Sequence, residues 1–221
     1  MKYIDLSHTI DDGLITYKGL PAPIICDYLS REDSSLHYDD GSTFQIGKIE
    51  MVGNSGTYMD CPYHRYEDGK DFSELFLNKL VDLPGVIIRS SYEHRLAIGV
   101  DQIAGTSVAG RAVLFQTTWD KYWRTDTYFE NHPFLTDDVA SFLVQEGALL
   151  VGIDSYNVDD TRVNRRPVHA KLLGSDILII EHMCNLHLIP QARPFTLTAV
   201  PPKICKVGSL PVRVYANLSD L

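Results

Sequence analysis

The sequence predicts an α/β fold, a mixed β-sheet core with flanking helices, in a single domain over residues 1–221. Residues 136–147, TDDVASFLVQEG, indicate a helix with Thr136 as N-cap, acids in its first turn and Gly147 as its stop. The apolar run ALLVGID follows directly as a buried strand, and such alternation is typical of helices packed on a sheet. A chain of 221 residues, 44% of them hydrophobic, is large enough for one such core.

The N-terminal part is predicted to form two strands separated by a long irregular stretch. Residues 3–6, YIDL, indicate a short strand before polar turn signals. Residues 43–51, TFQIGKIEM, alternate apolar and polar side chains only partly in phase, which indicates a strand with a bulge near Gly47. Residues 21–42 are rich in Asp, Ser and Glu, and a loop of this length is typical of a lid or a partner contact.

The middle of the chain is predicted to alternate helical turns with buried strands. Residues 72–80, FSELFLNKL, predict a short helix or helical turn, which the Pro-Gly pair at residues 84–85 ends. The run at 86–89 and AVLFQT at 112–117 indicate buried strands, with a helical turn over 99–104 between them. The aromatic-rich sequence at residues 117–134 is expected either to cover the hydrophobic core or to line a pocket for a flat substrate.

The C-terminal part is predicted to complete the sheet. Residues 168–173 indicate a short helix, and ILIIE at residues 177–181 an apolar strand that ends in a carboxylate. Strands are also predicted over residues 196–200 and 212–216, with two prolines and Gly208 shaping the turn between them.

The overall charge excludes several classes of partner. A net charge of −9 and a pI of about 5.3 argue against nucleic acid or an anionic membrane, because phosphate binding needs clustered Lys and Arg. The one basic cluster, Arg162, Arg165 and Arg166, lies among Asp159 and Asp160 and is interpreted as a solvated loop.

The sequence also predicts a soluble cytoplasmic protein with free thiols. It shows no signal peptide and no run near the roughly 20 apolar residues of a membrane span. Its four cysteines have no CxxC spacing, which favours free thiols in a reducing compartment. Cys61 is interpreted as a packing residue, with a nucleophile as the alternative.

Residues 53–69, GNSGTYMDCPYHRYEDG, form the strongest candidate for a functional site. Asp60 and His64 lie four residues apart, with Pro62 expected to hold the backbone extended between them so that both side chains reach one ligand. The alternative is a polar surface turn in which Asp60 caps a neighbouring element and His64 is solvated.

Two carboxylates end apolar strands, where α/β sheets commonly place ligand groups. These are Asp154 and Glu181, and the alternative is that strands simply end in polar residues. A carboxylate, an imidazole and a second carboxylate suit Zn²⁺ or Mn²⁺ and leave a further group free as a general base. The titratable groups that could meet are Asp60, His64, His169 and Glu181.

The chain resembles the cyclase-like hydrolase family that includes bacterial kynurenine formamidase, nearly from end to end. The segments that carry the resemblance are YIDLSHTI, DLPGVIIR, VGIDSYNVDD, PVHAKLLGSDILIIEHMCNLHLIP and FTLTAVPP, in family order. The family signature HxGTHxDxPxH aligns with NSGTYMDCPYH at residues 54–64, where Gly56, Thr57, Asp60, Pro62 and His64 match. The resemblance implies the swivelling β/β/α type of fold.

Two signature histidines are replaced, by Asn54 and Tyr58. In the family both bind one metal of a two-metal centre, and because an amide or a neutral phenol is a weak zinc ligand, that metal is expected to be absent. The resemblance implies that the second metal is held by Asp60, His169 and Glu181. It also implies that His64 is the acid/base histidine.

The resemblance therefore implies a hydrolase that cleaves an amide, formamide, lactam or lactone bond of a small, often aromatic molecule, with at most one divalent metal, Zn or Mn. Tyr58 either binds a developing oxyanion or fills the vacated ligand space, and Asn54 and Arg65 are expected to contact substrate. One alternative is a metal-free acid/base enzyme that uses Tyr58, Asp60, His64 and Glu181. The other is a non-catalytic binding protein.

Family members resemble dimers or tetramers. We therefore expect a homodimer or homotetramer in which residues 27–42 form a subunit contact that closes over the pocket.

Overall fold

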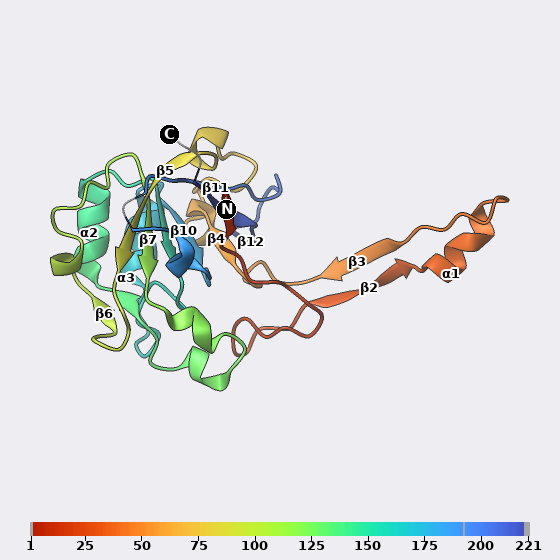
Figure 1. Ribbon diagram of the computed structural model, residues 1–221, viewed down its shortest axis with the longest axis horizontal. Helices are drawn as coiled ribbons and strands as arrows, with labels where there is room; N and C mark the ends of the chain where they lie inside the picture. Colours follow the sequence, from red (N-terminus) through yellow and green to blue (C-terminus); the bar gives the residue numbers. More distant parts are fainter. Residues whose placement is uncertain (1, 192, 219–221) are drawn as a thin grey trace.

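A nine-stranded mixed sheet forms the centre of the structure, a computed structural model that describes residues 2–191 and 193–218 (Figure 1). In order across the sheet its strands are β1 (Tyr3–Asp5), β13 (Val214–Asn217), β11 (Thr196–Ala199), β5 (Leu83–Arg89), β7 (Ala112–Gln116), β9 (Leu150–Ile153), β10 (Leu178–Glu181), β4 (Tyr58–Asp60) and β12 (Ser209–Pro211). The four central strands β5, β7, β9 and β10 run parallel, and the strands outside them pair antiparallel. This arrangement confirms the predicted α/β class and mixed sheet.

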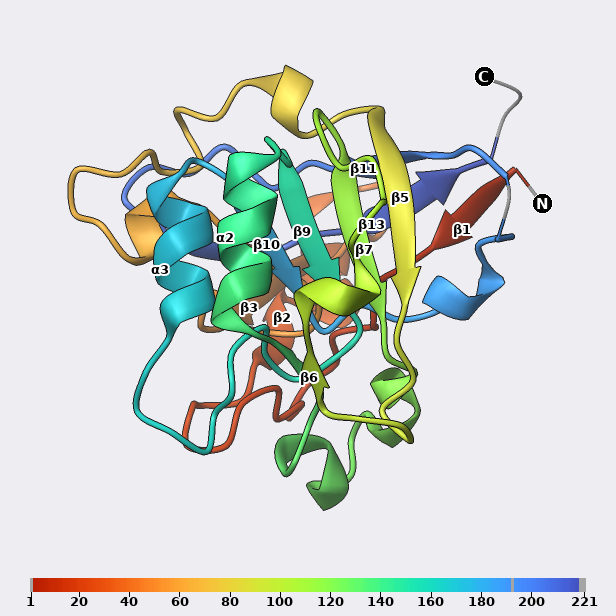
Figure 2. The same cartoon turned by 90° about the vertical axis from the view of Figure 1, so that its left-hand side faces the viewer.

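The longest helices cover one face of the parallel strands. Figure 2 shows α2 (Asp137–Gln145) and α3 (Pro167–Gly174) side by side in front of the sheet. Because side chains alternate along a strand, Val113 and Phe115 of β7 pack under these helices, whereas Leu114 packs into a second core on the opposite face. The sheet is therefore buried on both faces, which explains why its parallel strands are continuous apolar runs.

Most of the predicted elements are confirmed within two or three residues at their ends. Shorter elements complete the described chain: η2 (Pro62–His64), η3 (Leu77–Lys79), β6 (Ala97–Ile98), η4 (Val100–Gln102), η5 (Trp119–Tyr122), η6 (Asp126–Phe129), β8 (Phe134–Leu135) and η7 (Leu186–Leu188). The aromatic residues after β7 form a third buried cluster of Trp119, Tyr128 and Tyr156.

Two predictions about strands are wrong. Pro84 and Gly85 do not end a segment, because both lie inside β5. There Pro84 pairs with Thr196 of β11, and a Cβ at residue 85 would come 2.1 Å from the ring of Phe195, so only glycine admits this close approach. The predicted turn before the last strand contains β12, a three-residue strand too short to give an alternating pattern.

Most of residues 21–42, predicted as an irregular loop, instead belong to a projecting hairpin. The hairpin contains β2 (Ile24–Leu29), α1 (Arg31–Ser34), η1 (Ser35–His37) and β3 (Ile46–Glu50), and we call residues 24–50 the arm. β3 confirms the strand predicted over residues 43–51. Figure 1 shows the arm extending well away from the nine-stranded sheet. The bulge predicted near Gly47 is present, but the extra residue lies on the partner strand β2, between Asp27 and Leu29. Because nearly every residue of the pair is exposed, β2 has no apolar alternation by which to recognise it.

All four cysteines are free thiols, as predicted. Over the part of the chain that the structure describes, no helix has the length and apolar character needed to cross a membrane.

Candidate active site

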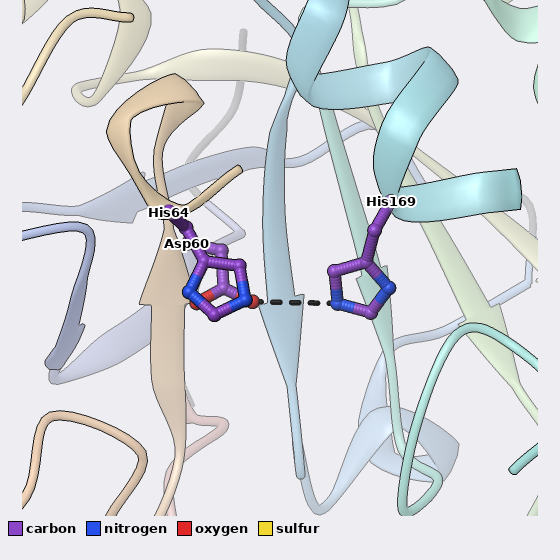
Figure 3. A group of neighbouring side chains, drawn as sticks. All are labelled: Asp60, His64 and His169. Carbon is purple, nitrogen blue, oxygen red and sulfur yellow. Dashed lines mark ion pairs between the residues drawn. The ribbon is translucent and has the colours of Figure 1, made fainter. Parts of the chain in front are cut away.

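Two antiparallel strands and one helix bring the predicted polar side chains together. Tyr58 of β4 lies opposite Glu181 of β10, and Asp60 follows two residues along β4. Since side chains two residues apart share a face of a strand, Tyr58 and Asp60 project toward the same side. The first turn of α3 adds His169, and η2 adds His64 just beyond β4. In Figure 3 the two imidazoles come from separate elements, and the Asp60 carboxylate, drawn overlapping the His64 ring, pairs with His169 through one of its oxygens.

His169 contacts carboxylates through both of its nitrogens. Its Nε2 lies 3.5 Å from Oδ2 of Asp60 and 3.5 Å from Oε1 of Glu181. Its Nδ1 donates to Oδ2 of Asp159 at 2.7 Å. Asp159 also accepts the backbone N–H groups of Val168 at 2.9 Å and of His169 at 3.0 Å, so one carboxylate caps α3 and orients the imidazole.

His64 is linked to Asp60 through a serine. Pro62 begins η2, so the expectation of an extended backbone here is wrong, and the turn carries His64 back over the end of β4. Ser209 of β12 lies opposite Asp60 in the sheet, donates its hydroxyl to Oδ1 of Asp60 and lies 2.9 Å from Nδ1 of His64. A Cβ at Gly208 would come 2.5 Å from the backbone of His64, so β12 can pass this close only with glycine there.

Tyr58 occupies the space beside Glu181. Its hydroxyl donates to Oε2 of Glu181 at 2.5 Å, and Oε1 accepts the backbone N–H of Val158 at 2.7 Å. Asn157 approaches Oε2 at 3.4 Å. Burial, with Glu181 and Asp60 nearby, raises the pKa of Tyr58 well above its usual value, so the phenol stays protonated.

The protonation of the cluster follows from burial and mutual charge. Burial alone would lower the pKa of His169, but Glu181, Asp159 and Asp60 outweigh it and raise the pKa to about 10. Burial raises the pKa of Glu181 to about 7, against the opposing charge of His169. For His64, burial lowers the pKa although Asp60 opposes this shift, so His64 is neutral near pH 7.

The donor set fits one divalent cation. Oδ2 of Asp60 is buried and makes no hydrogen bond to the described residues, and the nearest cationic group is Nε2 of His169 at 3.5 Å. A divalent cation bound there would take the place of the proton on His169, because a metal ligand must be deprotonated. One ligand atom each from Asp60, His64 and His169 lies within 4.8 Å of the other two. Glu181 approaches His169, but Tyr58 and Val158 already donate to its two oxygens.

This cluster forms part of the lining of a pocket of about 400 Å³. The lining residues are Tyr17, Lys18, Gly19, Leu20, Asn54, Tyr58, Asp60, His64, Arg65, Asn157, Arg166 and His169. Asn54 and Arg65, the two residues expected to contact substrate, therefore both line this pocket. Glu181 is fully buried behind Tyr58 and is not part of the lining.

Two other candidates lie away from this pocket. Asp154 accepts the N–H and hydroxyl of Thr117 and the N–H of Thr118, so it fixes the end of β7 instead of reaching the cluster. Burial raises the pKa of Cys61 to about 12, which fits the predicted packing role and leaves the thiol unreactive.

Sequence reasoning missed three residues of the cluster. Asp159 was interpreted as part of a solvated loop, and neither Ser209 nor Asn157 carries any motif. Acids near a helix start are a general capping signal, but Asp159 lies seven residues before Arg166, the N-cap of α3, where that signal does not apply.

The fold and this cluster define an α/β protein with a buried carboxylate and imidazole site between a strand pair and a helix. Residues 4–160 match the sequence model of the cyclase family, and the chain belongs to that family. It is 27% identical over 213 residues to a kynurenine formamidase from Geobacillus thermodenitrificans, covering 96% of this chain and 95% of that protein. A kynurenine formamidase from Bacillus cytotoxicus is 28% identical over 212 residues, with the same shares covered.

Solved structures share the fold along nearly the whole chain. Isatin hydrolase A from Labrenzia aggregata, bound to benzyl benzoate, aligns with a TM-score of 0.82 at 22% identity, covering 99% of this chain and 94% of that one. A structure described as a potential metal-dependent hydrolase with cyclase activity aligns with a TM-score of 0.80 at 24% identity, covering 100% and 99%. At these identities the likeness establishes the fold.

Proposed function

We propose that this protein hydrolyses an amide, formamide, lactam or lactone bond of a small aromatic molecule, as an arylformamidase-like enzyme. The observation that carries the proposal is the buried carboxylate of Asp60, which lies between His169 and His64 and has one oxygen without a hydrogen bond, at a pocket large enough for a single-ring compound. The kynurenine formamidase relatives supply the class of bond.

His64 is the proton carrier in this proposal. Ser209 donates its own hydrogen to Asp60, so its oxygen accepts the Nδ1 hydrogen of His64. The proton of neutral His64 is then on Nδ1, and the Nε2 lone pair is free to take a proton from the attacking water and return it to the leaving nitrogen or oxygen. Tyr58 donates to Glu181, which favours the packing role over oxyanion binding.

Asp60 and His169 would hold a single Zn²⁺ or Mn²⁺, with Glu181 as the third ligand implied by the family and His64 as the geometric alternative. Such an ion lowers the pKa of a bound water and polarises a substrate carbonyl. Asp159 would orient His169 for this role by holding its Nδ1 hydrogen.

Metal content tests the ligand set. We expect near-stoichiometric Zn or Mn by elemental analysis of protein purified without chelator, and loss of the ion in Asp60→Asn and His169→Asn. Glu181→Gln and His64→Ala then identify the third ligand, because metal binding weakens only when a true ligand is removed. Protein without metal after reconstitution would instead favour the metal-free acid/base enzyme.

Turnover tests the function itself. N-formyl aromatic amines, isatin-like lactams and aryl lactones are incubated with wild type, His64→Ala and the matched control His94→Ala, which changes an exposed histidine outside the pocket. General acid–base catalysis contributes about 10²- to 10⁴-fold, so we expect kcat to fall by that amount in His64→Ala alone. Unchanged turnover in His64→Ala removes this histidine from the mechanism, and no turnover by wild type favours the binding protein.

We also propose that the arm is a subunit contact in a homodimer or homotetramer. Most of its apolar side chains are exposed, and Leu36 is 88% and Ile49 61% exposed. A two-stranded hairpin is marginal by itself in water, so cover from a second copy would stabilise it. Closed homo-oligomers are the commonest assemblies of soluble chains, which favours a second copy over an unrelated partner.

A further inference from the structure

The pocket is lined by cations although the chain as a whole is acidic. Lys18, Arg65 and Arg166 line it, whereas Asp60 is the one carboxylate in its lining. The chain carries a net charge of −9, so this local excess of positive charge runs against the overall balance. A cavity lined by one sign of charge concentrates ligands of the opposite sign.

Two of these cations are not neutralised within the described chain. Elsewhere arginines pair with aspartates, as Arg95 does with Asp101 at 2.8 Å. Arg65 is exposed beside His64, and its side chain makes no hydrogen bond or ion pair with any residue that the structure describes. Lys18 differs, because Asp126 and Glu130 lie 3.4 and 3.8 Å away and balance its charge.

Arg166 is held in place without a counter-charge. Its Nη1 donates to the carbonyl oxygens of Val163 at 2.7 Å, Arg165 at 2.8 Å and Asp160 at 3.3 Å. These bonds fix the guanidinium plane while its Nε and Nη2 hydrogens have no partner among the described residues. A fixed planar fork with free hydrogens is the geometry that binds a carboxylate through two parallel hydrogen bonds.

We propose that Arg65 and Arg166 bind a carboxylate of the substrate, so that the substrate is an aromatic amide or formamide carrying an acidic group in addition to the bond that is cleaved. This inference rests on the proposed function and narrows it, because a neutral lactam would leave both cations unused. The aromatic part would lie by Tyr17, another lining residue, whose ring is fixed by stacking on Tyr156 at 4.4 Å.

Binding of product analogues tests the inference without turnover. Anthranilate carries the carboxylate and aniline lacks it, and each is titrated calorimetrically into wild type, Arg65→Gln and the control Arg165→Gln. Arg165 is exposed in the same loop as Arg166 but does not line the pocket. We expect anthranilate to bind Arg65→Gln about tenfold more weakly than wild type, to bind Arg165→Gln as wild type, and to bind more weakly as salt rises. Aniline should bind all three equally weakly.

Arg166 is tested by a conservative change, since it also organises its loop. Arg166→Lys keeps the charge but loses the fork, so we expect a partial loss of anthranilate affinity with unchanged aniline binding. Equal anthranilate binding by wild type, Arg65→Gln and Arg166→Lys, or no anthranilate binding at all, would overturn the inference.

Turnover measurements distinguish a failure of this inference from a failure of the proposed hydrolase function. N-formylanthranilate and formanilide differ only in the carboxylate, and we expect the acid to be hydrolysed with at least tenfold higher kcat/KM by wild type but not by Arg65→Gln. Equal turnover of both compounds overturns the anion site and leaves the hydrolase in place. Anthranilate binding that depends on Arg65, without turnover of either formamide, supports the anion site and contradicts the hydrolase.

Discussion

Tyr58 shows how one side chain changes the chemistry available to its neighbours. A histidine in the family signature is a tyrosine here, and its hydroxyl donates to Glu181 at 2.5 Å. Because both groups are fully buried, this bond is strong and leaves Glu181 less free to bind a cation. The same substitution therefore also occupies Glu181, which is one of the ligands in the metal site proposed above.

Ser209 is predicted to set the proton position on His64. In Ser209→Ala, Nδ1 of His64 loses its acceptor and Oδ1 of Asp60 loses its donor, so the tautomer with the proton on Nε2 becomes accessible. We expect kcat to fall at least tenfold with little change in KM, and ¹⁵N NMR to report mixed tautomers of His64.

The control for this prediction is Ser55→Ala, which removes a buried hydroxyl that donates to the carbonyl of Val52 outside the cluster. A single Nδ1-protonated tautomer in Ser209→Ala would contradict the role of Ser209 in orienting His64.

Among the individual site residues, the sequence identified those that lie in one local motif and missed those that reach the site through tertiary contacts. Asp60 and His64 lie in one short motif, so local pattern and family resemblance locate them together. Ser209 reaches Asp60 across 149 residues through the pairing of β12 with β4, and no local pattern records that pairing. Arg166 looked like part of a solvated cluster because sequence shows charge but not which charges remain unpaired.

At the scale of elements, buried strands could be predicted from the sequence and exposed strands could not be predicted reliably. β7 and β9 are buried on both faces and appear in the sequence as apolar runs, so their ends are predicted to within two residues. β2 and β3 of the arm are exposed on both faces, and only β3 was recognised. A strand without a buried face leaves no periodicity in the sequence, since the pattern reflects a core and not the backbone conformation.

The arm gives the prediction that belongs to this scale. Leu36→Asp and Ile49→Lys place charges on its exposed apolar surface, where they should have little effect on an isolated chain but disrupt contact with a second copy. We expect light scattering after size exclusion to show a dimer or tetramer for wild type and a smaller mass for both variants.

Val163→Lys is the matched control, because Val163 is 48% exposed but lies outside the arm. A monomeric wild type, or an unchanged mass in both variants and in a chain lacking residues 27–42, would refute the arm as a subunit contact.

At the scale of the whole molecule, buried histidines are predicted to make stability depend on pH. His132 is 3% exposed, and burial lowers its pKa to about 4 from an ordinary value of 6.5. Between these values the unfolded chain binds a proton that the folded chain does not, so stability is complete above pH 6.5 and falls as pH decreases toward 4. The loss from this residue between pH 6.5 and pH 5 is about 2 kcal/mol.

The measurement is the free energy of unfolding in urea across that range for wild type, His132→Gln and the exposed control His94→Ala. Glutamine also loses hydrogen bonds to Pro133 and Thr161, which lowers stability by a constant amount, so the diagnostic quantity is the slope with pH. We expect a shallower slope in His132→Gln alone, and an unchanged slope there would show that His132 is not the source.

Asp159 has a consequence for any attempt to give this protein a new substrate range. The same carboxylate caps α3 and orients His169, so one side chain of the loop before α3 serves both the scaffold and the reactive cluster. Libraries that vary this loop can therefore change exposed positions such as Asn164 freely. A change at Asp159 would damage folding and reactivity together, and selection for either property could not separate the two effects.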